Sequence, residues 1–279
     1  MRMQWTAWGT TVRVEVTDPD RAFAARRIVT RCVAQAKRAA DLGNPRAEVY
    51  RLVRSAGRPV RVSPVLAGLV AVAIGAAERS GGAVDPSVGA ATLPARWSHR
   101  ALRNLVPVCG ALPTRLPRPA PGWRGVEWTE QSIGIPQGSC LDLTATAKAH
   151  TAQRAATLVA DRCGMGALVE IGGDVASAGP APAGGWTVVP EHADAAVVRL
   201  ATGSAVASCR AAGIIDPLTG RTVRSPWQSV AVAGPDLVAA KTAAVTALVR
   251  GDDAAAYLDE IGVRAILVPR GRSLQIVAT

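Results

Sequence analysis

Polar and apolar residues alternate in many short segments of the chain, and this period of two predicts β-strands. The first such segment covers residues 4–16, close to the N-terminus. The alternating or continuously apolar segments that follow are a hairpin at 123–135 and strands at 166–171, 195–200, 204–209, 227–233, 263–268 and 273–277. Strands are therefore expected at both ends of the chain.

Between the strands, apolar residues recur at helical spacing. Asp18-Pro19 opens a helix that runs to about Arg38, with Phe23, Ile28 and Val33 among its apolar positions. Three more helices are expected: one from an N-cap at Ser63 and a proline at Pro64 to the stop at Ser80-Gly81-Gly82, one over 143–163 and one over 236–250.

Prolines are dense and hydrophobic periodicity is weak from about residue 93 to residue 122. This segment is interpreted as an irregular connection and not as a domain boundary. Residues 1–279 are therefore expected to form one α+β domain of mixed strands and helices, whose apolar share of 49% is enough for a sizeable core.

The formal net charge of +11 raises the expectation of acidic partners such as phosphate esters. The arginines are dispersed and no aromatic stripe lies among them, so no nucleic acid is expected as a partner. The chain has neither a signal-peptide pattern nor a membrane-length apolar run. Five cysteines without a CxxC pair, at positions 32, 109, 140, 163 and 209, fit a reducing compartment. A cytoplasmic protein that does not bind membranes is predicted.

Standard catalytic constellations are missing from the sequence. The histidines His99, His150 and His192 lack HExxH spacing, and neither a GxSxG elbow nor a GxxxxGK[ST] loop occurs. Turns rich in glycine and aspartate remain, and each of them alone has an ordinary structural explanation: Asp142, for instance, is a good helix cap. Lys148 differs, because a lysine one turn inside a helix can neutralise a phosphate held at the helix N-terminus.

Taken together, these turns resemble the FAD:protein FMN transferase (ApbE) family. That family has a Met-Gly-Thr strand start, a Gly-Ala-Phe-Asp-Pro-Thr-type turn, a Leu-Asp-Leu-Gly-Gly-Ile-Ala-Lys-Gly helix entry, an Ile-Gly-Gly-Asp strand end and a His-Ile-Ile-Asp-Pro-x-Thr-Gly motif. This chain has WGT, GAVDPSVG, LDLTATAKAH, VEIGGDV and GIIDPLTG in the same order, over about residues 6–251. No single motif is specific, but five in order are hard to obtain by chance.

The resemblance implies an ApbE/T-fold-like domain that binds FAD, usually with Mg²⁺. It implies transfer of FMN from FAD to a Thr or Ser hydroxyl of a partner flavoprotein, with release of AMP. Carried over position by position, the flavin or adenine contacts fall on Trp8, Ala83, Val84, Asp85, Asp142, Lys148 and Ile215. Ala145 would offer a backbone carbonyl to the metal.

Other positions depart from the family pattern. Gly213 stands where the family has the histidine before Ile-Ile-Asp-Pro, and Trp8 stands where it has methionine. The family's Ala-Asp-x-x-x-Thr metal motif falls on Ala240 to Val245, so the usual ligand positions hold Lys241 and Val245. A register one residue later, with Thr242 and Thr246, also lacks a carboxylate. Metal binding at the usual site is therefore not expected.

Two basic side chains could substitute for the lost groups. The Lys241 ammonium could occupy the place of the divalent ion, or Lys241 could be an exposed lysine without a role. His150 could replace the usual proton acceptor, or it could be an ordinary histidine on the helix surface.

Three functions remain open at this point. The first is an active FAD:protein FMN transferase with FAD and a flavin-accepting protein as partners. The second is a catalytically degenerate paralogue that binds FAD or acts as a scaffold, which the substitutions at 213, 241 and 245 favour. A basic protein of nucleic-acid or membrane surfaces ranks last, because only charge supports it.

Overall fold

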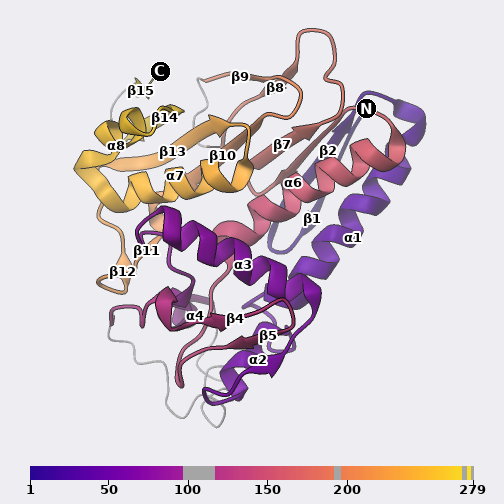
Figure 1. The fold of residues 1–279 in the computed structure, drawn as a ribbon. Helices are drawn as coiled ribbons and strands as arrows, with labels where there is room; N and C mark the ends of the chain where they lie inside the picture. Colours follow the sequence, from indigo (N-terminus) through magenta and orange to yellow (C-terminus); the bar gives the residue numbers. More distant parts are fainter. Residues whose placement is uncertain (97–116, 192–195, 272–274, 278–279) are drawn as a thin grey trace. The chain divides into compact units, whose positions relative to one another are not determined.

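The structure is a computed structural model that describes residues 1–96, 117–191, 196–271 and 275–277 (Figure 1). Helices and strands are mixed along the chain, which confirms the α+β class. The chain divides into two compact units. Unit 1 contains residues 1–34, 148–214 and 223–279, and unit 2 contains residues 35–147 and 215–222. The expectation of one domain over residues 1–279 stays a prediction.

Unit 1 is built on one eight-stranded sheet in which every neighbouring pair is antiparallel. In spatial order its strands are β1 (Arg2–Ala7), β2 (Thr10–Val16), β6 (Ala167–Ile171), β7 (Asp174–Ala178), β10 (Ala205–Arg210), β13 (Trp227–Gly234), β14 (Arg264–Pro269) and β15 (Gln275–Val277). In β2 the alternate residues Val12, Val14 and Val16 are buried, which is the pattern of a strand with one face on the core.

The predicted single strand over 4–16 is wrong, because this segment forms a hairpin of β1 and β2. Ala7 pairs with Thr10, so Trp8 and Gly9 are the two loop residues. Their φ angles are +51° and +67°. Two consecutive positive φ angles make a turn whose twist matches that of antiparallel strands, and they reverse the chain here.

Four helices belong wholly or partly to unit 1: α1 (Ala22–Ala40), α6 (Thr144–Cys163), α7 (Leu237–Arg250) and α8 (Ala254–Glu260). Short 3-10 turns occur at Pro19–Arg21, Ala211–Gly213 and Gly251–Asp253. Helix α7 packs along β10 and β13 (Figure 1). Its N-cap Asp236 accepts a hydrogen bond from the Ala239 N–H, and the Gln153 side chain of α6 accepts one from the Leu237 N–H. These caps satisfy two N–H groups that a helix start leaves without helical partners.

The hairpin of β8 (Trp186–Val188) and β9 (Val198–Leu200) was not predicted in full, because only its second strand shows a clear pattern in the sequence. Its large apolar side chains join a core cluster with the sheet, made of Leu168, Val175, Trp186, Val188, Leu200 and Val206. Part of the sheet is thereby covered by this hairpin.

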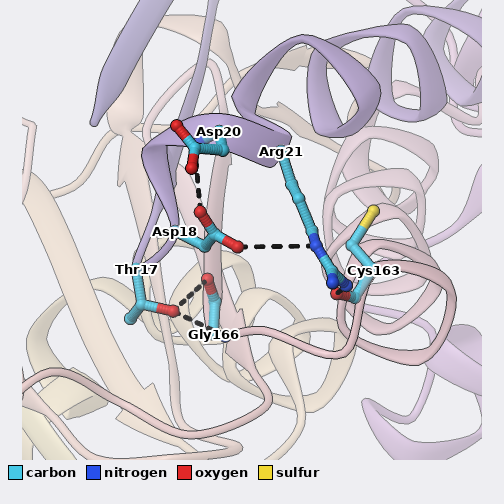
Figure 2. Close-up of polar contacts among 6 residues, drawn as sticks. All are labelled: Thr17, Asp18, Asp20, Arg21, Cys163 and Gly166. Atoms are coloured by element: carbon cyan, nitrogen blue, oxygen red, sulfur yellow. Dashed lines mark hydrogen bonds and ion pairs between the residues drawn. The ribbon is translucent and has the colours of Figure 1, made fainter.

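Polar contacts fasten the start of α1 to the end of α6, as Figure 2 shows. Thr17 Oγ1 accepts a hydrogen bond from the Gly166 N–H at 2.9 Å, and the Thr17 N–H donates to the Gly166 carbonyl at 3.0 Å. The Arg21 guanidinium pairs with Asp18 and donates to the carbonyl of Cys163, the last residue of α6. A cation at a helix C-terminus is favoured by the helix dipole.

The described residues of unit 2 form α2 (Val49–Arg54), α3 (Pro64–Arg79), α4 (Gly89–Arg96) and two small sheets. Its strands are β3 (Val60–Arg61), β4 (Glu127–Trp128) and β5 (Ser132–Gly134) in the order β3-β5-β4, and the pair β11 (Ile215–Asp216) and β12 (Arg221–Thr222); its 3-10 turns are Pro86–Val88 and Trp123–Gly125. Ser63 caps α3 as predicted, since its hydroxyl accepts from the Leu66 N–H at 3.2 Å. The hairpin predicted over 123–135 is confirmed by the pairing of β4 with β5.

Other predictions have mixed outcomes. The four predicted helices and the strands β6, β9, β10, β13, β14 and β15 are confirmed. The elements that were not predicted are β3, β7, β8, β11, β12, α2, α4 and α8. The segment expected to be irregular from residue 93 is helical up to Arg96, and residues 97–116 lie outside the described part, with His99 and Cys109 among them. The other four cysteines are buried and form no disulfide with one another. In the described parts of the chain, every helix is too short or too polar to cross a bilayer.

Candidate functional site

Two of the five motifs lie side by side in unit 1. The WGT motif forms the β1–β2 turn, and Gly172 and Gly173 of the IGGD motif form the β6–β7 turn with φ angles of +62° and +83°. The Gly172 N–H donates to the Thr11 carbonyl at 3.0 Å. A Cβ on Gly172 would lie 2.7 Å from Thr10 Oγ1, so only glycine allows this close approach. The two turns therefore meet at one end of the sheet.

Trp8 sits in this turn with an unusual backbone. Its φ of +51° lies in the left-handed region, which a bulky residue rarely adopts, and the residue is only 7% exposed. Strain of this kind persists where the surrounding structure fixes it, and it is concentrated at functional sites. The structure thus holds an indole at the position where the resemblance expects a flavin contact.

The most deeply buried ion pair among the described residues of unit 1 starts from Lys241 of α7. Its Nζ donates to Asp174 Oδ1 at 2.8 Å and to the Ser208 carbonyl at 2.7 Å. Lys241 is 9% exposed and Asp174 1%. Burial alone would lower the pKa of Lys241, but the Asp174 carboxylate outweighs burial and raises this pKa above its ordinary value. The ammonium is therefore charged, and the expectation of an exposed lysine is wrong.

The contacts of α7 also decide which register of the metal motif faces the sheet. The hydroxyl groups of Thr242 and Thr246 donate to carbonyls of their own helix, Val238 and Thr242, at 2.8 and 2.7 Å. It is Lys241 that reaches Asp174. The residue one turn later on that face is Val245, whose buried side chain has no ligand atom.

The residues of this cluster do not fit a divalent ion. Mg²⁺ needs about six oxygen ligands at about 2.0–2.1 Å in near-octahedral geometry. Here Asp174 Oδ1 and the Ser208 carbonyl are both bound to the ammonium. The neighbouring thiol of Cys209 has a pKa raised by burial, so it stays protonated. Within the described ranges no three His, Cys, Asp or Glu side chains are grouped as metal ligands would be.

Two further basic residues project from α6. Lys148 is half-buried, and its charge acts with that of Lys241 against the rise in pKa that burial causes at Asp174. His150 follows two positions later, and residues at i and i+2 of a helix do not face each other. Burial, followed by the charge of Arg154, lowers the pKa of His150, so its imidazole is neutral at pH 7. The expectation of an ordinary surface histidine is thus modified: His150 is half-buried and faces away from Lys148.

In unit 2 the GAVDPSVG motif is a tight turn organised by Asp85. The buried Asp85 carboxylate accepts hydrogen bonds from the N–H groups of Ser87 at 2.8 Å and Trp123 at 3.0 Å. Val84 is buried and Ala83 is half-buried beside it. Both carboxylate oxygens of Asp85 therefore hold backbone N–H groups in place.

The LDLTATAKAH motif lies against this turn. The Asp142 N–H donates to the Pro86 carbonyl at 2.7 Å, and Asp142 Oδ1 caps α6 by accepting from the Thr144 N–H at 2.8 Å. The capping role expected from the sequence is confirmed. Ala145 lies in the first turn of α6, where its carbonyl takes part in the helical hydrogen-bond ladder.

The GIIDPLTG motif forms the β11–β12 turn, which Ile215 opens. Asp216 holds it together, because its carboxylate accepts from the Leu218 N–H at 2.9 Å and from the Thr219 hydroxyl at 2.8 Å. Gly213, the first residue of the motif, belongs to unit 1 and is exposed. A Cβ at Gly213 would meet no atom within 4 Å, so this position has room for a side chain.

A comparison with family models matches residues 8–267 to the ApbE family. The chain belongs to the ApbE family. The family motifs quoted from the sequence are thereby confirmed as a true relationship. No curated protein matches this ApbE-family chain in sequence.

Solved structures of the ApbE family share its fold. The ApbE protein of Thermotoga maritima superposes with a TM-score of 0.79 at 19% identity, over 99% of this chain and 96% of its own. The apo flavinyl transferase ApbE of Pseudomonas stutzeri gives 0.78 at 18% identity, over 99% and 94%. A histidine-to-glycine mutant of the Vibrio cholerae flavin transferase ApbE gives 0.77 at 18% identity, over 99% and 96%. This chain therefore has the fold of these ApbE structures.

Two residues of the site were not singled out from the sequence. Asp174 ends the quoted IGGD motif, which could have pointed to this residue. Lys241, the partner of Asp174, is 67 positions away in the sequence. Gln153 caps α7 from α6, a contact that no local pattern indicates.

Proposed function

We propose that this ApbE-family chain is a flavin transferase that moves FMN from FAD to a Thr or Ser hydroxyl of a partner flavoprotein and releases AMP. The observation that carries the proposal is the family match over residues 8–267. The motifs support it, because each forms an ordered turn or helix start in the structure and none is disrupted by the substitutions.

Cofactor contacts are proposed for each unit separately. In unit 1, the proposed contacts come from Trp8, which is 7% exposed and would meet a flavin ring at this exposed part, and from Lys148, which offers a positive charge for a phosphate. In unit 2, the proposed contacts come from Ala83, Val84, Asp85, Asp142 and Ile215. Since the Asp85 and Asp142 carboxylates hold backbone N–H groups, their role is to shape the turns that receive the cofactor.

The reaction joins the acceptor oxygen to the phosphorus on the FMN side of the FAD pyrophosphate. The bridging P–O bond breaks, its electron pair leaves with AMP, and the acceptor hydroxyl gives up its proton. Catalysis of such a step depends on neutralising phosphate charge and positioning the hydroxyl. No step is assigned to a divalent ion, because the Lys241 cluster does not fit one. His150 is the candidate acceptor of this proton, although it faces away from Lys148.

A second candidate is a paralogue that binds FAD without transferring FMN. Two observations favour it: Lys241 and Val245 replace both side-chain ligands of the metal motif, and Gly213 replaces the histidine before Ile-Ile-Asp-Pro. In this case the fold and the cofactor contacts are kept, and only the chemistry is lost.

The two candidates are separated by incubating the purified protein with FAD and an acceptor domain that other ApbE-family transferases label. Flavin fluorescence of the acceptor in a denaturing gel and release of AMP are followed, with a Thr→Val acceptor as the control. Labelling supports the transferase, and FAD binding without labelling supports the binder. The variant Gly213→His, which has room for its side chain, is expected to label faster than the wild type. Absence of FAD binding would refute both candidates.

A further inference from the structure

Lys241 replaces an acidic residue at a position where the ApbE-family motif has a metal ligand. Its ammonium is not free in solvent but is held by a carboxylate oxygen of Asp174 and the carbonyl oxygen of Ser208, at 2.8 and 2.7 Å. Oxygens of these two types are also the ligands that hard divalent ions prefer. A positive charge thus stands between two oxygen atoms of the kinds that ligate divalent ions.

A divalent ion could enter this cluster only by displacing the ammonium. Displacement would leave a buried amine without its partners, and burying unpaired polar groups is costly. It would also place the charge of the ion next to that of Lys241. The valine at position 245 adds no ligand on the same face of α7.

We propose that the Lys241 ammonium is a built-in cation that replaces the divalent metal of the family, so that this chain binds FAD without metal. The proposal rests on the proposed function for its FAD part, but the exclusion of metal from the cluster can be tested without FAD. Lys241 and Asp174 together carry no net charge, so the ammonium fills the place of the metal, and the positive charge available for a phosphate comes from Lys148, which also acts on Asp174.

The substitution pair Lys241→Asp/Val245→Thr restores both motif ligands and is the central variant of the test. Mn²⁺ binding is measured by electron paramagnetic resonance on the wild type and on this variant, without FAD. The wild type is expected to leave Mn²⁺ free, and the variant to bind it. An exposed lysine, Lys37, provides the charge-matched control Lys37→Asp, which is expected to behave like the wild type.

FAD binding is measured in parallel by flavin fluorescence, in excess EDTA and in excess Mg²⁺. The wild-type Kd is expected to be the same in both, whereas Mg²⁺ tightens FAD binding to the variant by about 5- to 150-fold, the usual range for coupled sites. Stoichiometric Mn²⁺ binding by the wild type, or a wild-type Kd at least about tenfold lower with Mg²⁺, overturns the proposal. If the variant does not fold, the wild-type measurements decide alone.

Failure of the proposed function has a different signature. If the wild type binds no FAD in either condition, the proposed function fails. The Mn²⁺ measurements still support or overturn the replacement of the metal.

Discussion

Removal of the Lys241 charge is expected to destabilise the protein strongly. The substitution Lys241→Met keeps most of the apolar stem but leaves the Asp174 carboxylate 1% exposed and without its ammonium partner. Breaking a buried ion pair by removing one partner costs about 3–5 kcal/mol. For chains near this size, that loss lowers Tm by roughly 6–20 °C.

The reverse single variant and the double variant separate the ion pair from general packing. Asp174→Asn leaves a buried ammonium and is also expected to destabilise the protein. The double variant Lys241→Met/Asp174→Asn leaves no uncompensated charge, so its loss is smaller than the sum of the single losses by about 0.5–3 kcal/mol. The exposed control Lys37→Met is expected to change the free energy of unfolding by less than about 0.5 kcal/mol.

The pH dependence of the stability lost in Lys241→Met follows from the direction in which the pKa of Lys241 is shifted. The pKa of Lys241 is higher in the folded than in the unfolded chain. Its contribution is therefore fully present below the unfolded pKa of about 10.4 and is lost progressively as pH rises from there through the folded pKa. The Tm difference between wild type and Lys241→Met should be constant between roughly pH 6 and 9 and should shrink as pH rises above about 10.4. A loss below about 1 kcal/mol for Lys241→Met, or additive single losses, would refute the reasoning.

Four other outcomes are expected. Trp8→Leu weakens FAD binding by roughly 2- to 12-fold in a fluorescence titration, because ring stacking contributes about 0.5–1.5 kcal/mol; an unchanged Kd would remove Trp8 from the site. Asp85→Ala lowers the free energy of unfolding by about 1–3 kcal/mol in urea melts, since two N–H groups lose their acceptor, and Asp85→Asn loses less. Because the pKa of His150 is lowered in the folded chain, the protein loses stability as pH falls below about 6.5. The variant His150→Gln is therefore expected to show a smaller fall of Tm between roughly pH 7 and 5, and identical Tm profiles for variant and wild type would contradict this. Gly220→Ala destabilises the β11–β12 turn, where a Cβ would lie 2.0 Å from the Arg118 carbonyl oxygen, and a neutral Tm would contradict that clash.

Elements with local capping signals were predictable from the sequence. The start of α3 at Ser63-Pro64 and the span of α6 follow from residues that are neighbours in the chain. The β1–β2 turn was missed because two-residue hairpin turns usually carry Asn-Gly or Asp-Gly, and here tryptophan takes the first position. The alternating pattern therefore predicted one strand across a segment that contains a turn.

The buried face of α1 and the contacts between distant segments were not predictable. In α1, Phe23 is 67% exposed, and the buried face consists of smaller residues such as Ala25 and Val29, which give a weak hydrophobic signal. The partner of Lys241 depends on the packing of α7 against the sheet, so the sequence indicated the substitution at 241 but not its ion pair. For the same reason, the sequence alone was equally consistent with Lys241 being an exposed lysine without a role.

The central claim is transfer of FMN without a divalent ion, and intact mass spectrometry of an acceptor domain tests it most directly. The acceptor is incubated with this protein and FAD in excess EDTA, with its Thr→Val form as the control. The expected result is one FMN adduct on the acceptor hydroxyl, an equal amount of AMP and no adduct on the control. An acceptor that stays unmodified in EDTA but gains FMN when Mg²⁺ is added would contradict the metal-free account, and an acceptor unmodified in both conditions would contradict the transferase itself.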